Sequence, residues 1–143
     1  MLTVDVVLAA PLGAAGDEGR WRVLLVKRGR PPFQGTWALP GGFMEPHEPL
    51  EEAARRELRE ETGLAPERLV QLQAFGDPGR DPRGWTVSVV HLAVVTEEEA
   101  RSFQPKAADD AADVAWFDLD DLPALAFDHA QILAAARARL TGA

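Results

Sequence analysis

Three glutamates, Glu57, Glu60 and Glu61, are the residues whose types and spacing point most directly to chemistry. They end the stretch LPGGFMEPHEPLEEAARRELREETGL (39–64), whose second half has the periodicity of a helix over residues 49–62. The apolar face of this helix, at about 100° per residue, consists of Leu50, Ala53 and Ala54. One turn further on, that face meets Glu57 and Glu61 instead of leucine or valine. The pattern therefore predicts carboxylates that point inward, which needs a positive partner.

Three carboxylates this close repel one another, and burial without partners would raise their pKa values. Arg56 can reach Glu60 at the i+4 position, but one guanidinium group does not balance three acids. A divalent cation would, and oxygen ligands without a cysteine or histidine cluster favour Mg²⁺ or Mn²⁺ over zinc. Because Mg²⁺ usually keeps waters and bridges to substrate phosphates, the site composition indicates phosphate chemistry. The alternative is that Glu57 and Glu61 lie at a frayed, partly solvated helix end.

The remaining features of this helix have ordinary structural explanations. Pro49 suits the first helical position, and Gly63 suits a left-handed cap at the end. Two i,i+4 pairs of favourable orientation predict a solvated outer face: Glu51 with Arg55, and Glu52 with Arg56.

Composition limits the classes of function. The 143 residues, 46% hydrophobic and 27% charged, predict one domain over residues 1–143. A net charge of -8 argues against binding nucleic acid or an anionic membrane, since both need a basic surface. There is no cysteine, so disulfides and thiolate zinc sites are excluded. With neither a basic amino-terminal region nor an apolar run long enough to span a membrane, we expect a cytoplasmic protein.

Strand and helix patterns alternate along the chain. Strands are predicted at 2–10, 21–28, 68–75, 85–95 and 113–119, and helices at 49–62 and 127–140. The first two strands form a hairpin with a long connection. Strands interspersed with two helices predict an α/β protein with a mixed sheet between helices.

From Gly42 to Leu64 the sequence resembles the Nudix hydrolases. Their box is a glycine, five residues, a glutamate, seven residues, and then Arg-Glu-aliphatic-x-Glu-Glu-x-Gly-aliphatic. All nine defined positions are met, by Gly42, Glu48, Arg56, Glu57, Leu58, Glu60, Glu61, Gly63 and Leu64. The resemblance implies an α/β/α sandwich with a mixed β-sheet. It also implies hydrolysis of a nucleoside diphosphate linked to another moiety, by water attacking phosphorus with Mg²⁺ present and Mn²⁺ as a possible substitute.

The same resemblance implies roles for individual residues. Glu57, Glu60 and Glu61 would bind the metal together with a backbone carbonyl, that of Gly41. Glu60 or Glu61 would also orient or deprotonate the water, although other family members place that base in a different loop. Two further box residues would hold the loop to the helix at the catalytic site: Glu48 and Arg56.

Three stretches outside the box resemble the branch of the family that includes bacterial ADP-ribose pyrophosphatases: GRPPFQGTWALPGGF, FGDPGRDPRG and LAFDHAQIL. The second stretch reads as a stiff loop that Pro82 holds and that presents Arg80 and Arg83. Guanidinium forks suit bidentate contact with phosphate. The alternative is an exposed charged loop.

Further candidates for substrate binding are single residues. Arg28 ends a strand beside the catalytic loop and could meet a phosphate, or it could be solvated. Trp37 could stack on a base, or it could be buried and support the loop. Asp110, with Asp109, precedes the strand at 113–119, where some relatives place an additional metal ligand or base; the alternative is a turn. The histidines His91 and His129 are expected to be hydrogen-bonded structural residues.

The leading hypothesis is an Mg²⁺-dependent pyrophosphohydrolase acting on ADP-ribose or a similar nucleoside diphosphate sugar, as a homodimer. Within enzymes, the alternative is a Nudix hydrolase of nucleoside triphosphates, including oxidised ones, or of NADH. From another class, the domain could sense ADP-ribose without turnover, as in regulators that join a Nudix-like domain to a winged helix. The acidic composition, the complete box and the end of the chain at Ala143 argue against that reading.

Overall fold

A mixed β-sheet lies at the centre of the protein, which a computed structural model describes over residues 1–12, 19–103 and 111–142. The strands are β1 (Leu2–Pro11), β2 (Trp21–Arg28), β3 (Trp37–Ala38), β4 (Gly41–Phe43), β5 (Val70–Phe75), β6 (Val87–Val94) and β7 (Ala111–Asp118). They are ordered β3-β2-β1-β6-β5, with β4 also pairing with β1 and β7 with β2. The β1–β6 pair is parallel, and the other pairs are antiparallel.

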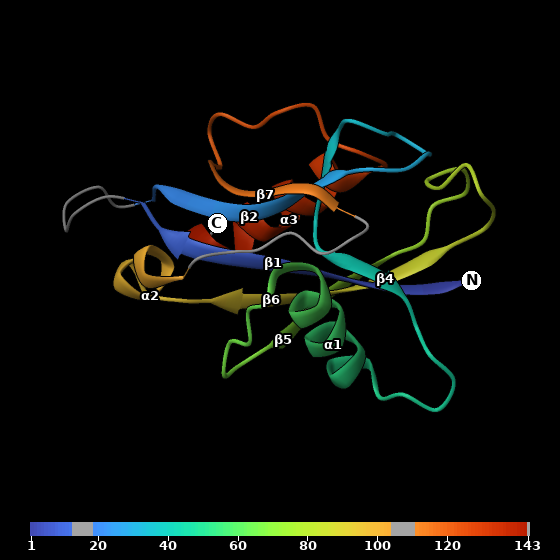
Figure 1. Ribbon diagram of the computed structural model, residues 1–143, viewed down its shortest axis with the longest axis horizontal. Helices are drawn as coiled ribbons and strands as arrows, with labels where there is room; N and C mark the ends of the chain where they lie inside the picture. Colours follow the sequence, from blue (N-terminus) through green and yellow to red (C-terminus); the bar gives the residue numbers. More distant parts are fainter. Residues whose placement is uncertain (13–18, 104–110, 143) are drawn as a thin grey trace.

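Helices cover both faces of this sheet, as Figure 1 shows. Alternate side chains of β1 point to opposite faces, so Val6 and Leu8 pack on α1 (Leu50–Thr62) and Val7 packs on α3 (His129–Thr141). All three of these β1 side chains are fully buried, because each face has its own helical cover. The predicted α/β class and α/β/α sandwich are confirmed, as is the hairpin of β1 and β2. None of the described helices is long and apolar enough to cross a membrane.

The boundaries of α1 follow local backbone rules. Gly63 has a φ of 80°, and its N–H donates to the carbonyl of Arg59, as predicted for a left-handed cap. The prediction for Pro49 is wrong by one position, because its ψ of 147° is extended and makes it the N-cap. Inside the last turn, the hydroxyl of Thr62 donates to the carbonyl of Leu58 and accepts from the N–H of Leu64. The end of the box helix is therefore held by backbone and side-chain bonds and is not frayed.

A third helix, α2 (Glu97–Ser102), was not predicted. Thr96 and Glu99 form a capping box at its start, and Ala100 is buried against the α1 side of the sheet. The Thr-x-x-Glu spacing was a local signal for this helix. The two short strands β3 and β4 were also missed, because each is too short to show alternation.

We predict that Gly63→Ala lowers the free energy of unfolding by about 1–2 kcal/mol, since a non-glycine residue is strained at positive φ. A Cβ at this position would meet no neighbouring atom, so the loss reports backbone strain alone. Chemical denaturation measures it. Gly63→Asn is the matched control and should lose less, and an alanine variant as stable as the wild type would contradict the prediction.

Candidate active site

A cavity of about 430 Å³ opens where β1, β4, the start of α3 and the loop before β6 meet α1. Its charged lining residues fall into two groups of opposite sign. The acidic group comprises Asp5, Glu45, Glu57, Glu60, Glu61 and Asp81. The basic group comprises Arg28, Arg56, Arg80 and Arg83. Segments from both halves of the chain therefore contribute to one polar cavity.

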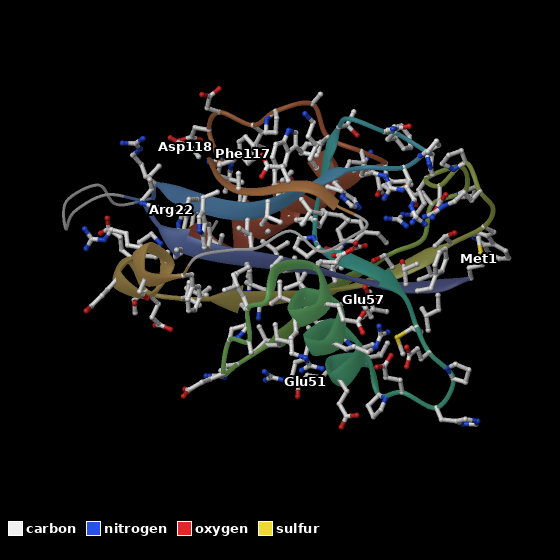
Figure 2. The ribbon with its side chains drawn as sticks, in the orientation of Figure 1. Met1, Arg22, Glu51, Glu57, Phe117 and Asp118 are labelled. Atoms are coloured by element: carbon white, nitrogen blue, oxygen red, sulfur yellow. The ribbon has the colours of Figure 1, made fainter. Side chains whose placement is uncertain are left out.

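The acidic group forms one wall of the cavity, called the acidic wall below, and two of its carboxylates lie against glycines of β4. The Gly41 N–H donates to Glu61 Oε2 at 2.7 Å. A Cβ on Gly42 would lie 2.7 Å from the carboxylate of Glu57, so only glycine allows this approach. Figure 2 shows Glu57 where α1 meets β4. The predicted inward direction is confirmed for Glu57 and Glu61, whereas the Glu60 side chain is 55% exposed.

Arg56 joins the loop before α1 to the helix. Its Nε and Nη2 donate to the two carboxylate oxygens of Glu48 at 2.7 and 3.0 Å. Its Nη1 donates to Glu57 at 3.0 Å and to Glu60 at 3.1 Å. The contact that holds the loop to the helix is thus where the resemblance placed it. The predicted outer-face pair of Arg56 with Glu52 is wrong, because an arginine flanked by three other acids turns toward them and is largely buried.

Burial controls the charge of the acidic wall. It raises the pKa of Glu61 to about 8, and the charges of Glu57 and Asp5 act in the same direction against the Gly41 N–H and Arg28. Burial also raises the pKa of Glu57, although Arg56 opposes this. Without a further cation, the wall therefore holds more acid than its positive neighbours can stabilise.

The donor set fits a hard divalent cation, since it offers carboxylate and backbone oxygens without cysteine. In the part of the chain that the structure describes, however, no three acidic or histidine side chains converge as a metal-binding group. The predicted convergence of Glu57, Glu60 and Glu61 is therefore not present. The reason is that Arg56 Nη1 separates Glu57 from Glu60 by bonding to both.

Two arginines of the basic group lie over the ring of Phe127, and this part of the cavity lining is called the basic wall below. The guanidinium carbon of Arg28 lies 5.0 Å from the centroid of this ring, and that of Arg83 lies 5.4 Å away. Asp81 fixes Arg83 through two hydrogen bonds of 3.1 and 2.9 Å, and the ring of Phe43 lies 5.0 Å from the same guanidinium. Burial and the nearby Arg83 lower the pKa of Arg28. Two neighbouring guanidinium groups that repel each other are suited to an anion between them.

The other predicted substrate-binding residues differ from these two. Arg80 lines the cavity, but its fork donates to both oxygens of Asp128 at 2.9 and 2.6 Å, and its side chain is 5% exposed. Trp37 does not line the cavity; its ring packs edge-on against Phe117 at 4.7 Å within the core on the α3 side. The half-buried ring thus packs against this core, and stacking on a base stays a prediction. Asp110 lies outside the described residues.

The cavity residues that sequence reasoning missed include Asp5, Asp81 and Phe127. Asp5 carried a signal, because it is the only charged residue in the valine-rich strand TVDVVL. His129 is confirmed as a hydrogen-bonded structural residue, since its Nδ1 accepts from the Leu39 N–H at 3.0 Å. The pattern of the helix that contains His129 could not predict that this residue lines the cavity.

Comparison with known proteins agrees with this geometry. The family model for the NUDIX domain matches residues 4–136. Among curated proteins, the chain is 47% identical over 112 residues to an ADP-ribose pyrophosphatase from Methanocaldococcus jannaschii, covering 78% of this chain and 63% of the relative. It is 34% identical over 144 residues to an ADPR responsive transcriptional repressor from Acinetobacter baylyi, covering 98% of this chain and 54% of the relative. The chain thus spans less than two thirds of the length of either relative.

Two solved structures are informative. The NUDIX domain of Shewanella oneidensis NrtR complexed with ADP ribose has a TM-score of 0.84 at 38% identity, covering 99% of this chain and 88% of that one. A bifunctional NMN adenylyltransferase/ADP ribose pyrophosphatase from Francisella tularensis, complexed with AMP and a manganese ion, has a TM-score of 0.73 at 33% identity. The match covers 93% of this chain and 39% of that one.

The raised pKa of Glu61 predicts how stability changes with pH in the cation-free protein. The unfolded carboxyl loses its proton near pH 4.5 and the folded one only near pH 8, so the Glu61 contribution to the free energy of unfolding falls across this window as pH rises. Glu61→Gln keeps an acceptor for Gly41 and removes this dependence. Thermal denaturation in a chelator should give the variant a higher Tm than the wild type at about pH 9 and a similar one at about pH 4.5.

The exposed Glu52→Gln, on the same helix, is the control and should leave the shape of the profile unchanged. Parallel Tm profiles for Glu61→Gln and the wild type would contradict the assigned protonation of Glu61.

Proposed function

Because the chain belongs to the NUDIX domain family, we propose that it is an Mg²⁺-dependent pyrophosphohydrolase of a nucleoside diphosphate linked to another moiety. The proposed substrate is ADP-ribose, which would give AMP and ribose 5-phosphate. The observation that carries the proposal is that half-buried carboxylates on α1 and two guanidinium groups over Phe127 line one cavity. A diphosphate and its cation need both kinds of group together.

Four groups would hold the cation: the carboxylates of Glu57, Glu60 and Glu61, and the carbonyl of Gly41. When bound, Mg²⁺ or Mn²⁺ supplies positive charge and Lewis acidity beside the diphosphate. The side chains of Glu57 and Glu60 could turn from Arg56 Nη1 toward the cation while the rigid guanidinium group keeps both of its bonds to Glu48. Oxygen donors and a manganese-containing structural neighbour support this assignment.

The reaction needs a water that attacks phosphorus and a base that takes its proton. An oxygen–phosphorus bond forms, and the anhydride P–O bond breaks so that the leaving phosphate carries the electron pair away. Glu60 or Glu61 would accept the proton. Arg28 and Arg83 would bind the non-bridging oxygens of the diphosphate. Arg80 would hold the loop through Asp128, with any phosphate contact requiring it to leave that partner.

ADP-ribose is favoured by two similarities. The Methanocaldococcus relative is named an ADP-ribose pyrophosphatase, and the Shewanella NUDIX domain was crystallised with ADP ribose. A second candidate, turnover of nucleoside triphosphates, is supported by 32% identity to the nucleoside triphosphatase NudI from Enterobacter sp., of which the match covers 84%. Hydrolysis of NADH is the related alternative. ADP-ribose sensing without turnover is supported by the repressor from Acinetobacter.

The proposal also includes a single domain over residues 1–143 that works as a homodimer in the cytoplasm on a small nucleotide. The match of the family model to residues 4–136 supports the single domain. The dimer and the location rest on the likeness to the family. Sedimentation of the purified protein tests the dimer.

A substrate panel with Mg²⁺ tests the function. We expect ADP-ribose to be hydrolysed to AMP and ribose 5-phosphate faster than nucleoside triphosphates, 8-oxo nucleotides or NADH, as measured by chromatography of the products. Glu61→Gln, nearly equal in volume, should lower turnover by roughly 100-fold or more, since it removes a charge at the cation site. Triphosphate turnover without ADP-ribose turnover would replace the substrate, and binding of ADP-ribose without any turnover would support the sensor.

Removing the guanidinium group of Arg83 should weaken substrate binding more than it slows the reaction. If the contact is equal in the ground and transition states, Arg83→Ala raises KM about tenfold or more with little change in kcat. Steady-state kinetics on ADP-ribose gives both constants. Arg59→Ala, exposed on α1, is the matched control. An unchanged KM for Arg83→Ala would assign the loop to structure alone.

A further inference from the structure

A buried polar group of three side chains reaches the cavity through two of its members, Asp5 and His129, and the proposed reaction does not use it. Asp5 comes from β1, Ser88 from β6 and His129 from the first turn of α3. Their exposed fractions are 8%, 0% and 3%. Buried polar side chains that are fully hydrogen-bonded make their surroundings rigid, so the partners of these three show what they hold in place.

Asp5 contacts Ser88, His129 and the segment 39–41. The Ser88 hydroxyl donates to Asp5 Oδ2, and His129 Nε2 lies 3.9 Å from Asp5 Oδ1. A Cβ on Gly41 would collide with Asp5 Oδ1 and with the carbonyl of Val4. The carboxylate therefore packs directly on the Cα of Gly41, which pairs with Asp5 in the β1–β4 register.

His129 holds the same loop from its other end. Its Nδ1 accepts from the Leu39 N–H at 3.0 Å, so that nitrogen carries no proton and Nε2 carries it. Burial lowers the pKa of His129 and keeps the ring neutral. The charged groups around the ring are Asp5, Asp128, Arg80 and Arg28. A neutral ring of fixed tautomer is a stable acceptor for a backbone amide.

These contacts fix three consecutive residues. The Leu39 N–H is bound to His129, the carbonyl of Pro40 accepts from the Val6 N–H at 2.8 Å, and the Cα of Gly41 rests on Asp5. The remaining N–H of this segment, that of Gly41, donates to Glu61. The direction of the Glu61 carboxylate therefore depends on where the segment 39–41 is held.

We propose that Asp5, Ser88 and His129 are positioning residues that hold the segment 39–41 so that the Gly41 N–H directs the Glu61 carboxylate into the cavity. Their effect on turnover rests on the proposed hydrolase function, whereas their effect on the loop does not. Because none of the three has to touch the reacting atoms, their removal should lower kcat more than it changes KM.

Two substitutions of His129 separate the hydrogen bond from the rest of the ring. Asparagine can place its Oδ1 where Nδ1 lies and still accept from Leu39, whereas the longer glutamine places its amide near the position of Nε2. His129→Gln should speed hydrogen exchange of the Leu39 and Gly41 amides about tenfold, equivalent to one lost hydrogen bond. It should lower kcat on ADP-ribose roughly 10- to 100-fold, with KM changed by less than about threefold.

His129→Asn should restore both readouts to within about threefold of the wild type. The Leu24 amide in β2 reports overall stability and should stay far better protected than the Leu39 and Gly41 amides in all three proteins, which shows that these two exchange by local opening. If His129→Gln does not fold, Ser88→Ala replaces it, because that variant removes the donor to Asp5 and should also speed exchange at Gly41.

The proposal is overturned if Gly41 exchanges at the wild-type rate in the glutamine variant, or in Ser88→Ala where that variant replaces it. Equal losses in His129→Asn and His129→Gln would also overturn it, because the ring volume and not the hydrogen bond would then matter. Exchange is measured without substrate, so a chain that does not hydrolyse ADP-ribose leaves this test intact. If the Gly41 amide exchanges fast in a variant whose kcat is normal, the position of the segment 39–41 does not affect turnover. The proposed effect of the three residues on kcat would then be wrong.

Discussion

The rest of this structure depends on one constraint: the carboxylates of Glu57 and Glu61 are partly buried, and their negative charge must be stabilised there. Glu57 and Glu61 continue the inward face of α1, where an ionised carboxylate is costly without compensation. The described part of the chain compensates in three ways: Arg56 bonds to Glu57, the Gly41 N–H bonds to Glu61, and a raised pKa keeps a proton on Glu61 near neutral pH. Each leaves room for a divalent cation to complete the neutralisation.

This constraint explains the small residues around the acidic wall. A carboxylate can reach the backbone of β4 only if no Cβ stands in the way, which accounts for the glycines at positions 41 and 42. The same closeness lets β1 support the loop from below through Asp5. The position of the Glu61 carboxylate is thus set by backbone geometry and by buried hydrogen bonds, neither of which requires a bound ligand.

The opposite wall uses paired charges to place two cations close together. Asp81 fixes Arg83, Asp128 fixes Arg80, and the ring of Phe127 carries Arg28 and Arg83 on its π system. Asp128 is also the N-cap residue of α3, so the loop before β6 is attached to the start of that helix. A diphosphate bound between the two walls would therefore contact groups fixed by the sheet and by both long helices.

The sequence by itself determined the features that depend on neighbours along the chain. Alternation and helical periodicity predicted five strands and two helices within a few residues, the left-handed Gly63 followed from backbone sterics, and the box spacing identified the acidic face of α1. A local signal for α2, Thr96 with Glu99, was also present although it was not used. Only the tertiary structure decided which side chains meet through space. Arg80 bonds to Asp128, Trp37 packs against the core, and the His129 side chain accepts from the Leu39 N–H ninety residues away. Such partners have no period or spacing in the sequence, because they are chosen by the strand order and by the balance of buried charge.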